Sequence, residues 1–321
     1  MKLKKLKSSL LGTLSPMNIS VCITVLNEES GIAKLLDSLL AQTKKPNEII
    51  VVDGGSSDRT IEIITHYQKK DRIIKLLKEK CSRARGRNLG VEIAKGDIIA
   101  ITDAGCIAEP NWIKNLTSPF ENKEVEVVAG FYKMTALNPF EEAESVFLGV
   151  APENFNVSFL PSARSLAFRK ETWEKVGGFP ESLEDTAEDT VFNYKLLKAG
   201  VKYARVKDAI VGWGMPTTLK DFYKKVFFYA KGDAKTKILF FPGKGLMSHN
   251  IKAILVFLRY ILGIILVIFS FNSTPLLFIL LILISLYLFR AYKKAGFWGV
   301  VLQFTSDFAV MSGFLSGILG R

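Results

Sequence analysis

Four short apolar runs alternate with segments of helical periodicity near the start of the chain, and this alternation constrains the fold most. The runs cover residues 19–25, 48–52, 73–77 and 98–102. Helical spacing of apolar residues follows the first run, and further helices are predicted over 60–67 and 82–94. Alternating strands and helices favour a mostly parallel sheet with helices on both faces. The sequence therefore predicts an α/β domain of the Rossmann-like, doubly wound kind.

Polar side chains stand where three of these predicted strands end. Asn27 and Glu28 follow the first, Asp53 ends the second, and Asp103 ends the fourth. Ligands of open α/β sheets bind at the carboxyl ends of the strands, because helices cover both faces. We therefore expect these side chains to share one site. Capping of the following turn is the alternative interpretation of Asp103.

Beyond residue 112 the regular alternation stops. Strands are predicted over 125–132 and 165–168, helices over 139–148, 170–176 and 191–199, and an irregular loop over 151–161. The acidic pair Glu188-Asp189 stands just before the last of these helices. A helix dipole favours carboxylates at its N-terminal end. Helix capping and a role in a functional site both remain open for this pair.

The apolar and basic residues are unevenly distributed. Apolar residues make up 49% of the 321, and most of the excess lies after residue 250. The net charge is +12, and eight lysines stand between Lys220 and Lys252 against Asp221 and Asp233. Basic runs beside an apolar tail indicate the anionic face of a membrane and no nucleic-acid partner. The three cysteines have no CxxC spacing, so they indicate neither zinc nor a disulfide framework.

The C-terminal part contains three apolar stretches, over 253–271, 275–289 and 297–319. A membrane-spanning helix needs about 20 apolar residues, which the first and third stretches provide and the second does not. Lysines and arginines before the first stretch and after the second predict a cytoplasmic side. We expect a multi-pass protein of the plasma membrane with a cytoplasmic catalytic domain. The predicted division is a basic segment 1–16, a catalytic domain 17–216, an amphipathic interfacial segment 217–250, and a membrane region 251–321 with two to three helices.

The residue types at the strand ends indicate transfer chemistry on a nucleotide. Acidic side chains can bind a ribose, a base or a divalent cation on a diphosphate, and arginines can neutralise phosphate oxygens. A carboxylate from Glu188-Asp189 could deprotonate a hydroxyl nucleophile. The sequence contains no GxxxxGK[ST] or GxGxxG motif. That argues against an ATPase and against a dinucleotide-dependent oxidoreductase.

A series of segments, in order over most of residues 19–237, resembles the membrane-attached, inverting members of glycosyltransferase family 2, which have the GT-A fold. These segments are ITVLNEESG, VVDGGSSDRT, SRARGRNLG, TDAGC, PSARSLAFRKETW, GGF followed by EDTVFNYKLLKAG, and YAKGDAK. The resemblance implies a nucleotide-diphosphate sugar as donor. It also implies that Asp189 is the general base and that Glu188 supports it. The nucleotide-sugar contacts that it implies come from Asn27, Glu28, Asp53, Arg83, Arg87, Asn88 and Asp103.

The chain departs from the family pattern at its acidic DxD position. The segment reads Asp103-Ala104-Gly105, and Gly105 stands where relatives commonly have a metal-binding acid. The resemblance implies a divalent cation, Mg²⁺ or Mn²⁺. Asp103 would hold it together with waters and the diphosphate, or an acid elsewhere would contribute. Metal dependence is thus an expectation that rests on Asp103.

The chemical type of the acceptor can be inferred from the expected general base, Asp189. A polyprenyl phosphate is already an anionic nucleophile, whereas a hydroxyl needs a base such as Asp189. We therefore expect a hydroxyl acceptor on a lipid-linked glycan at the membrane surface. The alternatives are a polyprenyl-phosphate glycosyltransferase and a non-catalytic nucleotide-sugar-binding membrane protein. A processive polysaccharide synthase is disfavoured because the sequence has no QxxRW motif.

Overall fold

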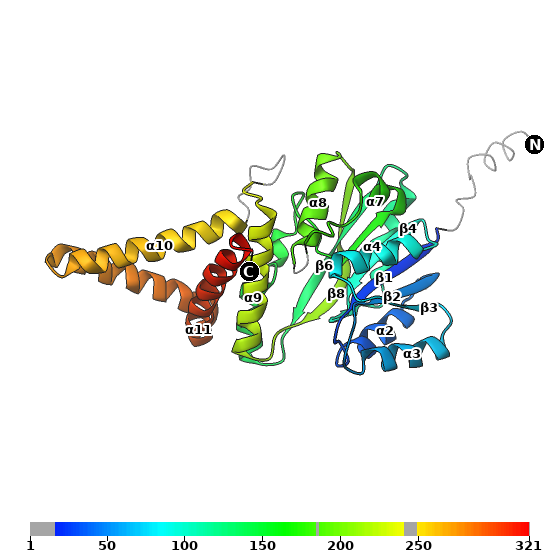
Figure 1. Cartoon of the computed structure of the whole chain (residues 1–321), viewed down its shortest axis with the longest axis horizontal. Helices are drawn as coiled ribbons and strands as arrows, with labels where there is room; N and C mark the ends of the chain where they lie inside the picture. The colour runs from blue at the N-terminus through cyan, green and yellow to red at the C-terminus, as the bar shows by residue number, and fades with distance from the viewer. Residues whose placement is uncertain (1–16, 184–185, 241–248, 321) are drawn as a thin grey trace, which may run out of the picture.

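The computed structural model describes residues 17–183, 186–240 and 249–320, and the predicted basic segment 1–16 lies outside this part. The described chain forms one eight-stranded sheet with helices on both faces, followed by long C-terminal helices (Figure 1). The strands are β1 (Ile19–Val25), β2 (Glu48–Asp53), β3 (Ile74–Lys78), β4 (Ile98–Asp103), β5 (Cys106–Ala108), β6 (Val127–Thr135), β7 (Leu166–Arg169) and β8 (Tyr203–Gly214).

The sheet has the order β3-β2-β1-β4-β7-β6-β8-β5. Its first half, from β3 to β4, is parallel throughout, as the alternation of strands and helices predicts. The second half is mixed: β7 is antiparallel to β4 and β6, β8 is parallel to β6, and β5 is antiparallel to β8. The α/β fold class is confirmed, with a mixed sheet.

Two helical layers cover this sheet. The helices and 3-10 turns of the catalytic part are α2 (Ile32–Leu40), α3 (Thr60–Lys70), α4 (Arg83–Ile93), α5 (Trp112–Thr117), η1 (Ser118–Glu121), α6 (Pro139–Leu148), η2 (Pro152–Asn154), α7 (Lys170–Val176) and α8 (Glu188–Lys198). Alternate strand residues point to opposite faces. Val21 and Ile23 therefore pack with α2, α3 and α5, whereas Cys22 packs with α4 and α8.

The register of the parallel half aligns the polar strand ends. Val25 of β1 pairs with Asp53 of β2, and Thr24 pairs with Asp103 of β4. The loop after β1, which carries Asn27 and Glu28, therefore begins at the same edge as both aspartates. This edge is where ligands of open α/β sheets bind.

The C-terminal part consists of α9 (Leu219–Thr236), α10 (His249–Ser270) and α11 (Thr274–Ile318). Helix α11 is broken at Ala295 and Gly296, which have non-helical backbone angles. Helix α10 and the first half of α11 project away from the sheet, and the rest of α11 returns along α9 (Figure 1). By length and composition alone, α10 and α11 are apolar enough to cross a membrane.

Close contacts and one polar cluster hold these helices together. A Cβ atom added at Gly313 of α11 would lie 2.2 Å from the carbonyl oxygen of Phe227 in α9. Only a residue without a side chain allows this approach. Within the apolar helices, Arg259 donates to Asp307, which also accepts from the hydroxyls of Tyr260 and Tyr287. The two charges within the apolar stretches thus neutralise each other.

Candidate functional site

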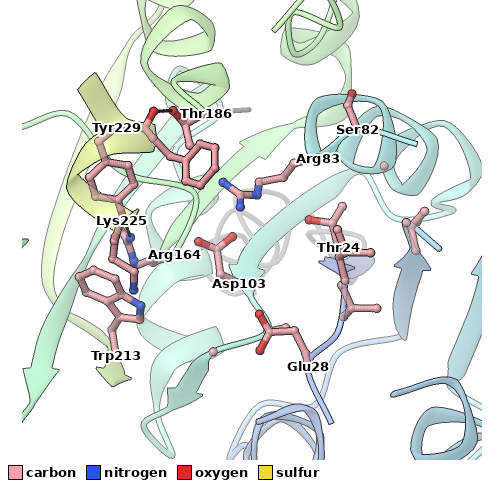
Figure 2. A pocket seen from close by; sticks show the side chains of 18 of the residues that line it. Thr24, Glu28, Ser82, Arg83, Asp103, Arg164, Thr186, Trp213, Lys225 and Tyr229 are labelled. Atoms are coloured by element: carbon pink, nitrogen blue, oxygen red, sulfur yellow. Dashed lines mark hydrogen bonds between the residues drawn. The ribbon is translucent and has the colours of Figure 1, made fainter. Parts of the chain in front are cut away.

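A cavity of about 750 Å³ lies at the carboxyl ends of β1, β2 and β4. The first turn of α4 forms one wall, and α9 forms the opposite wall with Lys225 and Tyr229. Figure 2 shows Asp103 at its centre, with Arg83 pointing toward the Asp103 carboxylate and Glu28 approaching from the loop after β1. A cavity of this size can enclose a nucleotide-sized ligand.

A buried arginine links the two predicted acidic segments. The Arg87 guanidinium donates through Nη2 to Oδ1 of Asp103 at 2.7 Å, and through Nη1 to Oε1 of Glu188. Arg83 approaches the same Glu188 oxygen at 3.8 Å. Residues 103 and 188 lie far apart in sequence, yet one side chain from α4 holds both at one site.

Asp103 and Arg87 both keep their charge at neutral pH. Although burial opposes ionisation of Asp103, Arg87 and then Arg164 lower the pKa of its carboxyl group below the usual range. Burial likewise opposes the charge of Arg87, but Glu188 and Asp103 raise the pKa of its guanidinium. Asp103 is therefore a carboxylate and Arg87 a cation.

Glu28 shares the cavity with Asp103. Burial raises the pKa of the Glu28 carboxyl group, and the nearby Asp103 raises it further. Its backbone N–H donates to Thr60, which fixes the loop after β1 against the start of α3. Glu28 and Asp103 thus line the same cavity.

Asn27 and Asp53 are not among the residues that line the cavity, but they hold the loops that carry lining residues. Asn27 has a left-handed backbone (φ 56°), and its side-chain oxygen accepts the Ser57 N–H at 2.8 Å. Oδ2 of Asp53 accepts from the N–H groups of Gly55 and Ser56. Within the described chain, the buried Oδ1 of Asp53 has no hydrogen-bond partner.

Asn88 lies on α4 but is not among the residues that line the cavity. Its amide nitrogen donates to the Phe179 carbonyl, and its Oδ1 accepts from Phe179 N–H and from Nε1 of Trp173. Asn88 thus ties α4 to the turn at residues 177–179. Any effect on a ligand would pass through the position of α4.

Asp189 lines a second, smaller cavity of about 150 Å³. Its carboxylate accepts the Thr190 N–H at 2.8 Å and the Ala163 N–H at 3.3 Å. Burial and then Glu188 raise the pKa of this carboxyl group. Tyr132 lines the same cavity and stacks with Arg164, which lines the larger one, so the two cavities are neighbours.

Sequence analysis did not identify four residues that line the larger cavity. These are Arg164, Trp213, Lys225 and Tyr229. Arg164 lies in the quoted segment PSARSLAFRKETW, but nothing in that segment shows which side chain faces the sheet edge. Trp213 reaches the site through β8, a strand absent from the prediction. The mixture of lysines and aromatic residues in α9 was the available signal for Lys225 and Tyr229.

Comparison with known proteins agrees with this geometry. Residues 20–170 match the family model described as glycosyl transferase family 2. The match covers just under half of the chain, which is similar to this family over that part. The cavity residues from Thr24 to Arg164 lie within the matched region, whereas those from Thr186 to Tyr229 lie beyond it.

Two curated glycosyltransferases illustrate the range of similarity. Glycosyltransferase GlyG of Streptococcus pneumoniae is 33% identical over 116 residues, which are 36% of this chain and 38% of GlyG. Glycosyltransferase AglE of Haloferax volcanii is 28% identical over 228 residues, which are 69% of this chain and 74% of AglE. The first alignment thus covers well under half of either protein, and the second covers most of both.

A solved structure shares the fold over the whole chain. It is the mannosyltransferase PcManGT from Pyrobaculum calidifontis in complex with GDP-Man and Mn²⁺, with a TM-score of 0.70 and 18% sequence identity. The match covers 100% of this chain and 95% of PcManGT. The GT-A-like architecture with C-terminal helices is therefore confirmed.

The residues of this cavity fit a divalent cation poorly. Among the described residues, no group of three or more His, Cys, Asp and Glu side chains is placed to hold one. Asp103 already accepts from Arg87, and Gly105 provides no ligand. A cation at this edge would have Asp103 and Glu28 as its carboxylate neighbours, next to several positively charged side chains.

Proposed function

We propose that this chain transfers a sugar from a nucleoside diphosphate sugar to a hydroxyl acceptor, with inversion at the anomeric carbon. The observation that carries this proposal is the Arg87 bridge between Asp103 and Glu188. It joins the strand-end cavity suited to a donor with the acidic pair suited to activating an acceptor. A simple helix cap at Glu188-Asp189 would not require such a link.

The larger cavity would bind the donor. Glu28, Arg83 and Asp103 line it, and Asp53 lies in the chain between the lining residues Val52 and Gly54. Asn27, Arg87 and Asn88 would act by holding these groups in place. This assigns the nucleotide-sugar contacts to the ends of β1, β2 and β4 and to the first turns of α4.

The acidic pair would provide the base. The acceptor oxygen attacks the anomeric carbon while the bond from that carbon to the diphosphate oxygen breaks. Asp189 takes the hydroxyl proton, and the nucleoside diphosphate leaves with the bonding electron pair. The raised pKa of Asp189 supports this role, because a more basic carboxylate accepts a proton more readily near neutral pH. Glu188, paired with Arg87, would orient the start of α8.

The acceptor would be a lipid-linked glycan at the cytoplasmic face of the plasma membrane. The second cavity combines Asp189 with Tyr132, Phe159 and Ser162, a mixture of aromatic and polar groups that suits a sugar. We assign catalysis to 17–216, contact with the membrane interface to 217–250, and membrane anchoring to 251–321. The exposed apolar helices and the lysines of α9 support this arrangement.

Replacement of Asp189 by Asn tests the proposal. The amide cannot accept the hydroxyl proton, so we expect transfer to fall by about 10²–10⁴-fold. Transfer from UDP-, GDP- and dTDP-sugars to lipid extracts is measured with purified enzyme in native-like membranes, and the lipid product is identified. Nucleoside diphosphate affinity is the control, because the larger cavity should be unaffected.

Near-normal transfer by Asp189→Asn would refute the assignment of the base. A glycosyl phospholipid as sole product would show that the acceptor is a phosphate. Donor binding without any turnover by the unaltered protein would favour a non-catalytic role.

A further inference from the structure

We infer that a cluster of side-chain cations, Arg164, Lys225 and Arg83, neutralises the diphosphate of the donor in place of a divalent metal ion. This inference rests on the proposed function and concerns the same cavity. It differs from the expectation of a metal ion drawn from the sequence.

Gly105 leaves open space where a second carboxylate would point. A Cβ atom added at this residue would meet nothing within 4 Å, and Gly105 lines the cavity. The remaining acid of the segment, Asp103, already accepts a hydrogen bond from Arg87. Hard divalent cations are usually held by several oxygen ligands. The segment therefore lacks the donor set for one, although it has room for it.

Arg164 lies beside this open space and is fixed by aromatic rings. Its guanidinium carbon lies 3.7 Å from the ring centre of Trp213 and 4.9 Å from that of Tyr132. Nη2 donates to the Tyr229 hydroxyl at 2.9 Å. Within the described residues, its buried Nε has no hydrogen-bond partner. A rigid guanidinium with a spare donor is well suited to a phosphate oxygen.

Lys225 adds a second charge to the same place. Its ammonium nitrogen lies 4.4 Å from the ring centre of Trp213. Figure 2 shows Arg164 and Lys225 together between Trp213 and Tyr229, with Arg83 on the far side of Asp103. Burial and then the charge of Arg164 lower the pKa of the Lys225 ammonium to about 8. Two cations crowded together in a half-buried site would be stabilised by a bound anion.

The charged side chains that line the cavity also favour binding of an anion. Its lining has four cationic side chains and three carboxylates, and Asp103 is itself paired with Arg87 behind the wall. The cations are Arg83, Arg164, Lys224 and Lys225. Fixed charges in a site sheltered from water stabilise a leaving diphosphate without reorganisation. The four cationic side chains would instead repel a bound metal ion.

The first test compares nucleoside diphosphates with nucleosides on the full-length protein in lipid nanodiscs. Replacement of Arg164 by Gln should weaken binding of UDP, GDP or dTDP by about tenfold or more, the size of a lost charge-assisted hydrogen bond. Binding of the matching nucleoside should stay unchanged. Arg205→Gln is the control, because Arg205 is half-buried but does not line the cavity. Equal weakening of nucleoside and nucleoside diphosphate by Arg164→Gln would overturn the inference.

The second test removes and adds the metal directly. We expect the affinity of the unaltered protein for the nucleoside diphosphate to be the same in excess EDTA and in Mn²⁺. The electron paramagnetic resonance signal of Mn²⁺ should show no protein-bound ion in the presence of the nucleotide beyond that bound to nucleotide alone. Loss of nucleotide affinity in EDTA that Mn²⁺ restores would overturn the inference.

The third test restores the missing acid. In Gly105→Asp the new carboxylate has the space to enter the cavity, so Mn²⁺ should now strengthen nucleotide binding several-fold. Gly105→Asn is the matched control, because it has the same shape without the charge and should gain no response to Mn²⁺. A response to Mn²⁺ that is equal in both variants would contradict the inference. If no nucleoside diphosphate binds with or without Mn²⁺, the proposed function itself fails and this inference falls with it.

Discussion

The surroundings of Lys225 act on the pKa of its ammonium group in opposite directions, and its charge is sensitive to pH. Burial and Arg164 lower the pKa of its ammonium group to about 8, while Glu144, Glu28 and Asp103 act in the opposite direction. Below pH 8 the side chain is a cation, and as the pH rises through 8 it loses its charge. A diphosphate that relies on this cation would then bind more weakly.

We therefore predict that kcat/KM for the donor falls above about pH 8, since kcat/KM reports the free enzyme. The acid limb belongs to Asp189, whose raised pKa makes activity decline as the pH falls through it. In Lys225→Arg the charge persists, because an arginine stays protonated throughout this range. The alkaline limb should disappear from its pH profile. An unchanged alkaline limb in this variant would assign that titration to another group.

Some residues of the site can be predicted from the sequence, and others cannot. Asp53 and Asp103 were predictable because each ends an apolar run, and parallel pairing with β1 brings such ends together. Arg164 and Trp213 were not, because their meeting depends on how β6, β7 and β8 pair. That pairing joins residues about 40 to 80 positions apart and leaves no local periodicity.

At the level of elements, helix α9 belongs to both halves of the molecule. Phe222 and Val226 are buried in a cluster with Leu302 and Ala309 of α11, while Lys225 faces the cavity. The sequence predicts α9 as amphipathic, and both interpretations of it, membrane contact and core packing, were open. Its apolar side packs on α11 in a core that also includes Ala143 of α6. The position of the cavity wall therefore depends on the C-terminal helix.

This dependence predicts the effect of a larger residue at Gly313. A leucine there would clash with the carbonyl oxygen of Phe227, a backbone atom, and overpacking of this kind costs about 1–3 kcal/mol. We expect α9 to shift and nucleoside diphosphate affinity and thermal stability to fall, with the protein still in the membrane. Gly263→Leu in α10 is the control, since a side chain there meets nothing within 4 Å. Equal losses of affinity and stability in both variants would show that the contact between Gly313 and Phe227 does not influence the cavity.

At the scale of the whole molecule, the described chain has one apolar surface with no protein to cover it. Helix α10 and the first half of α11 expose large side chains, including Phe269 at 61% and Phe278 at 63%. Such a surface is far larger than soluble monomers expose. The third apolar stretch behaves differently, because its Leu302 and Ala309 are fully buried in a cluster with residues of α6 and α9. Its sequence alone resembles that of a span, and only packing against α9 distinguishes it.

We therefore predict that the chain is held by its apolar hairpin and not by its basic surface alone. After expression in cells, the full-length protein should stay with the membrane pellet in high salt and in alkaline carbonate, and detergent should release it. Salt weakens attraction between lysines and anionic lipids, whereas it does not extract apolar helices from a bilayer. A variant with aspartates at Leu262, Phe269, Phe278 and Leu286, all exposed on the hairpin, should be released by salt. Release of the unaltered protein by salt alone would show that it is attached only at the surface, through α9 and its neighbouring lysines.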